Sequence, residues 1–213
     1  VHIQSMGDGS FRTVYSDILG KYIALADWKI ASILMDEYYC TAVADLETKA
    51  IRTVKDNLKE IAAGEKDACE KLMYALILSG LAMQMTGNSR PASGAEHHMV
   101  HLWDMEVVNG HLDALHGEKV SAATMLVLLE YKKLADAIRR GACRVHAFTD
   151  GDTELLQETF GRKGILGALE KENTPELLDD VSTETLSGAL PEILKIIDFL
   201  PAVTDMQEMM SIV

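Results

Sequence analysis

Apolar side chains recur at intervals of three and four residues along almost the whole chain after residue 17. This spacing lines one face of an α-helix, whereas a half-buried strand would show a period of two. Glycines separate the periodic segments, at places where helices commonly end. The sequence therefore predicts an all-α, multi-helix bundle of about eight helices with no strand. The predicted segments are residues 18–33, 51–61, 72–83, 99–108, 120–138, 153–160, 175–181 and 183–197, with a short one from 205, and the separating glycines are Gly64, Gly87, Gly110, Gly141 and Gly151.

Two segments leave an alternative open. Residues 81–85 and 99–108 are apolar enough for short buried strands, but β-branched residues are few and their flanks are helical, so helices are favoured. Residues 1–16 have a mixed composition with two glycines and are expected to form an irregular lead-in. The predicted division is thus a lead-in over 1–16 and one helical domain over 17–213.

Charge and cysteine usage restrict the partners and the compartment. The chain has 213 residues and a net charge of -13, from 33 acidic and 20 basic residues, which disfavours nucleic acid as a partner. Its three cysteines are far apart and show no C-x-x-C spacing, as is typical of reduced thiols in a cytoplasmic protein. Neither a signal peptide nor a membrane-spanning segment is recognisable, so we expect no membrane partner.

Five of the seven histidines, at positions 97, 98, 101, 111 and 116, lie within 20 residues. His97 and His101 are four residues apart and share a helix face. Two imidazoles and one carboxylate suit zinc, nickel or iron, with a coordination position left for substrate. Asp17 could supply the carboxylate or could cap the first helix, and the histidines could equally be hydrogen-bonded residues without a metal. The residues alone do not choose between these readings.

Three motifs resemble the sn-glycerol-1-phosphate dehydrogenase family, a branch of the iron-containing alcohol dehydrogenase and dehydroquinate synthase superfamily. The motifs are residues 17–29 (DILGKYIALADWK), 89–98 (SRPASGAEHH) and 116–120 (HGEKV). The resemblance extends over residues 14–213 and corresponds to the helical C-terminal domain of that family. It implies that Asp17, His97 and His116 are the metal ligands, with zinc, nickel or iron as the divalent metal.

The resemblance also implies roles for residues beside the ligands. His101 would lie near substrate and pass protons, unless it merely packs beside Trp103 or Met105. Lys21 and Arg90 would pair with a substrate phosphate, unless they are ordinary surface charges. Two further residues of the third motif, Glu118 and Lys119, are expected to orient or cap the helix that follows His116.

In the resembled enzymes the metal polarises the ketone of dihydroxyacetone phosphate, and NADH or NADPH delivers a hydride, giving sn-glycerol 1-phosphate. There, a separate N-terminal α/β domain binds NAD(P). Only 16 residues precede Asp17, and a single βαβ unit needs about 30. We therefore expect no cofactor-binding residues in this chain.

Three functional readings follow. The favoured one is the metal- and substrate-binding domain of such a dehydrogenase, incomplete without its cofactor domain. The second is a free-standing helical protein that binds a metal or a phosphate ligand without dehydrogenase activity, and the third is a structural bundle with vestigial histidines. A domain without its partner domain would expose apolar surface, so a homo-oligomer is expected.

Overall fold

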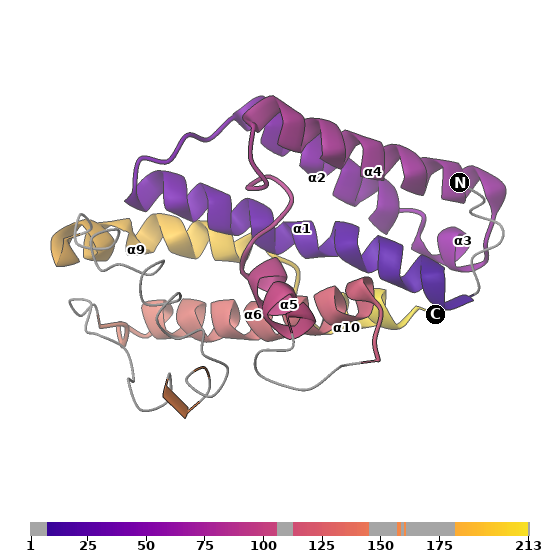
Figure 1. Ribbon diagram of the computed structural model, residues 1–213. Coiled ribbons are helices and arrows are strands. Elements are labelled where there is room, and N and C mark those ends of the chain that lie inside the picture. Colours follow the sequence, from indigo (N-terminus) through magenta and orange to yellow (C-terminus); the bar gives the residue numbers. More distant parts are fainter. Residues whose placement is uncertain (1–7, 106–112, 145–156, 159, 161–181, 213) are drawn as a thin grey trace.

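The computed structural model describes residues 8–105, 113–144, 157, 158, 160 and 182–212 (Figure 1). No strand occurs in these residues, and the all-α prediction is confirmed. Residues 81–85 and 99–104 are helical, which settles the alternative of short strands for those positions. The helices are α1 (Asp8–Leu34), α2 (Thr41–Lys55), α3 (Leu58–Ala62), α4 (Lys66–Thr86), α5 (Ala95–Asp104), α6 (His116–Arg139), α9 (Thr183–Asp198) and α10 (Val203–Ser211).

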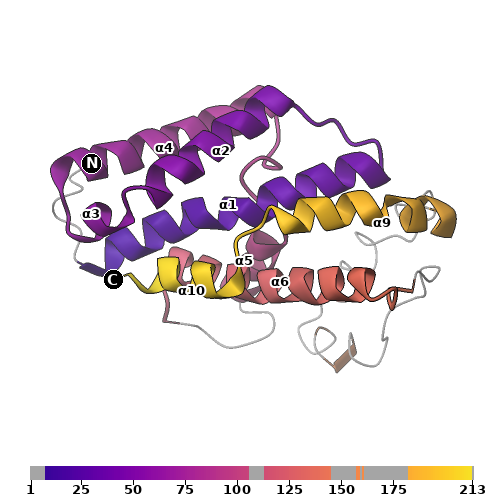
Figure 2. The same cartoon turned by 180° about the vertical axis from the view of Figure 1, so that it is seen from behind.

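Helix α1 runs through the middle of the bundle. The paired helices α2 and α4 lie along one side of it and α6 lies along the other, as both views show (Figures 1 and 2). Helix α9 packs against α1 and α6, while the short helix α5 packs against the same two helices near the middle of α1. Helix α1 is apolar around most of its circumference because neighbouring helices cover it on several sides. Its fully buried residues include Tyr15, Ile18, Leu19, Ile23 and Trp28.

The first helix starts earlier than the sequence predicts. Residues 8–16 are helical and belong to α1, so an irregular lead-in over 1–16 is wrong for this part. Packing explains the difference: Tyr15 is fully buried in the core, and this tertiary contact outweighs a composition that disfavours a helix. Asp17 consequently lies nine residues inside α1, from residue 8 to residue 17, and is not its N-cap.

Glycines end helices where the sequence predicts breaks. Gly64, Gly87 and Gly141 have φ angles of 70°, 70° and 61°, in the left-handed region that favours glycine. The predicted segment 51–61 contains a break and contributes to both α2 and α3. The predicted helix at 175–181, most of the one at 153–160, Gly110, Gly151 and His111 lie outside the described residues. Among the helices that are described, none is long and apolar enough to cross a membrane.

Candidate metal centre

Three side chains that are distant in sequence meet where α1, α5 and α6 come together. Asp17 comes from α1, His97 from the first turn of α5, and His116 is the first residue of α6. Each offers one ligand atom, and these atoms all lie within 4.8 Å of one another. His97 Nε2 is 3.2 Å from Asp17 Oδ1, and the ring centroids of His97 and His116 are 5.6 Å apart. One carboxylate and two imidazoles are a donor set that divalent transition metals accept.

Glu96 fixes the orientation of His97. Its carboxylate is fully buried, and its Oε1 accepts a hydrogen bond from His97 Nδ1 at 2.7 Å and another from the amide of Gly94 at 3.1 Å. This contact holds the proton on Nδ1 and leaves Nε2 facing Asp17. Histidines that bind metals are commonly oriented by a carboxylate in this way, which also raises their basicity.

His116 has a weaker and more exposed support. Its side chain is 48% exposed, and its Nδ1 lies 3.4 Å from Asp104 Oδ2. Asp104 also accepts a hydrogen bond from Lys119 Nζ at 2.7 Å. Glu118 accepts a hydrogen bond from the amide of Leu115 at 2.7 Å and so caps α6. The predicted cap by Glu118 is confirmed, whereas Lys119 pairs with Asp104 of α5 and does not cap α6.

The pair formed by Asp17 and His97 is strongly polarised. Burial alone would raise the pKa of Asp17, but the hydrogen bond from His97 and the charge of Lys21 lower it to about 2. Burial would lower the pKa of His97, but hydrogen bonds to Asp17 and Glu96 raise it to about 9. At neutral pH the metal-free site is therefore an ion pair, and a bound cation would replace the proton on His97.

Two glycines bring α6 close enough to α1 for these ligands to meet. A Cβ added to Gly117, which follows His116, would lie 1.8 Å from the backbone oxygen of Thr13. On the facing helix, a Cβ at Gly20 would lie 2.9 Å from Val120 Cγ1. Only a residue without a Cβ permits such close approach of a backbone. The glycine of the HGEKV motif thus sets where His116 stands relative to Asp17.

A cavity of about 510 Å³ lies beside His97. His101 lines it and is exposed, with its ring centroid 6.2 Å from that of His97 and 6.4 Å from that of His116. Arg90 also lines it, and its Nε donates to Glu37 Oε1 at 2.7 Å while a second nitrogen donates to Oε2. The remaining lining residues are Asn88, Ser89, Ser93, Gly94 and His98. The structure therefore brings two of the three predicted substrate-site residues to one cavity.

Lys21 is the predicted residue that the structure places elsewhere. Its side chain is only 4% exposed, and its Nζ donates to Asp17 Oδ2 at 3.2 Å and to the carbonyl oxygen of Ala92 at 3.4 Å. It does not line the cavity that His97 and Arg90 share. In this arrangement Lys21 holds the second oxygen of Asp17 and leaves the first facing His97.

Sequence reasoning missed three residues of the site. Glu96 precedes His97 within a quoted motif, and a carboxylate next to a proposed ligand is a signal that could have been used. Asp104 follows His97 by seven residues, which is two helical turns and therefore the same face of α5. Glu37 lies between α1 and α2 and carried no such signal.

Fold and site together define the class of the protein: an all-α domain in which three helices bring together a carboxylate and two imidazoles able to hold a metal ion. No protein-family model matches the chain. The chain is nevertheless similar to several curated proteins, which are named glycerol-1-phosphate dehydrogenase (NAD(P)+). The chain belongs to the glycerol-1-phosphate dehydrogenase family.

Three relatives illustrate the extent of the similarity. The protein from Halalkalibacterium halodurans is 43% identical over 122 residues, which are 57% of this chain and 31% of the relative. That from Geobacillus thermodenitrificans is 34% identical over 170 residues, 74% of this chain and 42% of the relative. That from Pyrococcus horikoshii is 34% identical over 149 residues, 68% of this chain and 42% of the relative. The chain thus spans less than half the length of these relatives.

Proposed function

We propose that this chain is the metal- and substrate-binding helical domain of an NAD(P)-dependent glycerol-1-phosphate dehydrogenase, which interconverts dihydroxyacetone phosphate and glycerol 1-phosphate. One observation carries the proposal: the ligand atoms of Asp17, His97 and His116 lie within 4.8 Å of one another, in a chain related to such dehydrogenases. The adjoining cavity offers a place for a small substrate.

The residues at the site fit a divalent cation. Asp17 and the two imidazoles would hold it, and the carboxylates of Glu96 and Asp104 accept hydrogen bonds from the other ring nitrogens. Zinc, nickel and iron all suit this donor set. When bound, the ion would act as a Lewis acid toward the carbonyl oxygen of the substrate.

Substrate handling falls to Arg90 and His101 in this proposal. Arg90 is held by its paired hydrogen bonds to Glu37, and its guanidinium suits a phosphate group at the cavity wall. His101 is exposed at the same cavity and would exchange a proton with the substrate oxygen. Lys21 instead positions Asp17, a role that its burial and hydrogen bonds favour over the phosphate contact predicted from the motif.

The nicotinamide cofactor would bind a separate domain, as the resemblance implies, and would supply the hydride that reduces the carbonyl carbon. The names of the relatives include NAD(P)+. A cytoplasmic location also belongs to this proposal, and it is supported by the three cysteines, all of which are free. The expected homo-oligomer stays a prediction.

The decisive experiment is elemental analysis of the purified chain, without chelators or a metal-binding tag. We expect near one metal ion per chain in the wild type after exposure to zinc or nickel, and none in the double variant His97→Ala, His116→Ala. His98→Ala is the matched control, since this exposed histidine lines the cavity but is not one of the three proposed ligands.

Absence of metal from the wild type, or an unchanged metal content in the double variant, would overturn the proposal.

A titration with glycerol 1-phosphate separates the dehydrogenase domain from a free-standing metal-binding protein. Glycerol 1-phosphate should bind the metal-loaded chain, and Arg90→Ala should weaken it roughly tenfold or more, as for loss of a charge-assisted contact. Metal binding without any affinity for this phosphate would favour the free-standing protein.

A further inference from the structure

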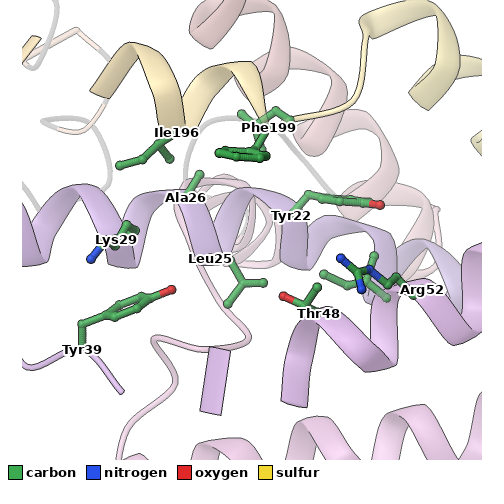
Figure 3. A pocket seen from close by; sticks show the side chains of 11 residues that line it. Tyr22, Leu25, Ala26, Lys29, Tyr39, Thr48, Arg52, Ile196 and Phe199 are labelled. Carbon is green, nitrogen blue, oxygen red and sulfur yellow. The ribbon is translucent and has the colours of Figure 1, made fainter. Parts of the chain in front are cut away.

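A second cavity, of about 500 Å³, lies on another face of α1, between that helix, α2 and α9 (Figure 3). Helix α1 lines it with Tyr22, Leu25, Ala26 and Lys29, which follow helical spacing. The residues of α1 that face the metal centre and α5, namely Asp17, Gly20, Ala24 and Asp27, form a different stripe. The two cavities have no lining residue in common.

The wall of this cavity combines an apolar surface with cationic ends. Figure 3 shows Ile196 and Phe199 on one side, opposite Leu25 and Thr48. Tyr22 and Arg52 lie at one end, and Lys29 and Tyr39 lie at the other. The other lining residues are Ala26, Ile51 and Leu200. No carboxylate is among the described residues that line it, although the chain as a whole has a net charge of -13.

The two cationic side chains that line the cavity, Lys29 and Arg52, differ in their contacts. Lys29 Nζ lies 4.5 Å from the centre of the Tyr39 ring, a favourable cation–π contact. Arg52 is exposed and forms no ion pair with the part of the chain that the structure describes. The end of the cavity at Arg52 and Tyr22 is therefore the one that offers an unpaired guanidinium and a phenol to an anion.

Phe199 adds an apolar contact at the rim. It ends helix α9, and its side chain is 88% exposed, more than any other large apolar residue described. A ligand with an apolar body would cover this ring as well as Leu25 and Ile196. Cavities of this size with mostly apolar walls and a few polar groups are typical of small-molecule sites.

We propose that this cavity binds a medium-chain aliphatic carboxylate, with the alkyl chain among Leu25, Ile196 and Phe199 and the carboxylate at Arg52 and Tyr22. The apolar wall favours an alkyl chain as the body of the ligand, and the unpaired guanidinium of Arg52 favours a negatively charged head group. This site is separate from the metal centre and independent of the dehydrogenase function proposed above.

The test is calorimetric titration of the purified chain with decanoate below its micellar concentration. Decanoate should bind more tightly than octanoate by about fourfold for each additional methylene. Decanol, decyltrimethylammonium and acetate separate the contributions: the neutral and cationic chains should bind at least about tenfold more weakly than decanoate, and acetate should not bind.

Two variants and a control locate the site. Arg52→Gln should weaken decanoate binding about tenfold, since a charge-assisted contact is lost. Lys55→Gln removes an exposed charge from the same helix outside the cavity and should leave the affinity for decanoate unchanged. Ala26→Phe fills the cavity and should abolish binding while zinc binding at the metal centre persists. Should this variant fail to fold, Arg52→Gln decides the matter alone.

Equal affinity for decanoate and decyltrimethylammonium, or an unchanged affinity in Arg52→Gln, would overturn the proposal. A failure to bind decanoate would overturn it as well, and a mass that doubles with concentration would then identify a second copy of the chain as the occupant. Neither result touches the metal-binding test, so failure of the two proposals can be told apart.

Discussion

The two faces of α1 are built differently. Toward α5 and α6, the helix carries Asp17 and Lys21, whose polar atoms are fixed by hydrogen bonds, and Gly20, which permits close backbone packing. Toward α2 and α9, it carries larger side chains that leave a cavity of about 500 Å³. One face is closely packed, whereas the other leaves space.

This difference shows how a single helix can serve two purposes. A metal centre needs its ligands held within a fraction of an ångström, and the α1–α6 contact achieves this through glycine and buried hydrogen bonds. Apolar contacts are non-directional and tolerate a cavity. A substitution on the first face should therefore disturb both the fold and the metal centre, while a similar one on the second should leave the metal centre unchanged.

The largest effect is expected from Gly117→Ala. The new Cβ would lie 1.8 Å from the backbone oxygen of Thr13, so α1 and α6 must separate. We expect a loss of about 3 kcal/mol in the free energy of unfolding, together with weaker zinc binding as His116 moves. Denaturant unfolding and zinc titration would measure the two effects.

Gly80→Ala is the matched control for this variant. Gly80 lies inside α4, and a Cβ there would meet nothing within 4 Å. The same chemical change should then stabilise the chain by about 0.5–1 kcal/mol, because alanine favours a helix interior over glycine. Equal effects of the two substitutions would contradict the close contact between α1 and α6.

The second prediction concerns pH and the ion pair at the metal centre. His97 has a folded pKa of about 9 against an ordinary value of 6.5, so its contribution to the stability of the metal-free chain is complete below pH 6.5 and lost as the pH rises through 9. Asp17 has a folded pKa of about 2 against 3.8, so its contribution is complete above pH 3.8 and lost as the pH falls through 2.

Zinc affinity should change in the opposite direction to stability over the alkaline range. Because the ion must displace a proton from His97, affinity should rise about tenfold per pH unit from 6.5 toward 9. On the other face, burial raises the pKa of Tyr22 and Tyr39 above 10, so decanoate binding should stay level over this range. Titrations at several pH values would test both; a flat zinc profile would argue against His97 as a ligand.

A smaller effect is expected when the carboxylates that orient the ligands are removed. Glu96→Ala should lower zinc affinity by about 10- to 100-fold, because His97 loses a buried partner at 2.7 Å. Glu96→Gln keeps an acceptor oxygen and should recover part of the loss. Asp104→Ala removes the exposed 3.4 Å partner of His116 and should have the weaker effect of the two alanine variants. The reverse order would show that exposure does not govern these contacts.

The smallest effect on zinc binding is expected on the cavity face. Ala26→Phe adds a ring at a buried position that lines the cavity, so the free energy of unfolding should fall by about 1–3 kcal/mol. Zinc affinity should remain within about twofold of the wild type, since no ligand moves. A large loss of zinc binding would show that the two faces of α1 are coupled.

Local patterns were sufficient for much of the fold. Helical periodicity predicted the segments that became α4, α6 and α9, and Gly64, Gly87 and Gly141 marked real helix ends. The sequence pattern places the start of α1 too late, because the first two turns are held by the burial of Tyr15, a contact that no local pattern reveals. For the same reason Asp17, which the sequence leaves open as a metal ligand or a helix cap, lies inside α1 and is not its cap.

The sequence by itself determined the helical class, the family resemblance and the three candidate ligands, because helix period and short motifs are properties of neighbouring residues. The tertiary structure decided which charges share a cavity. It buried Lys21 against the carbonyl oxygen of Ala92, paired Arg90 with Glu37, and put Asp104 beside His116. Such pairings join residues that are distant in sequence, so they depend on how the helices and the segments between them come together, and close contact at Gly20 and Gly117 brings α6 against α1.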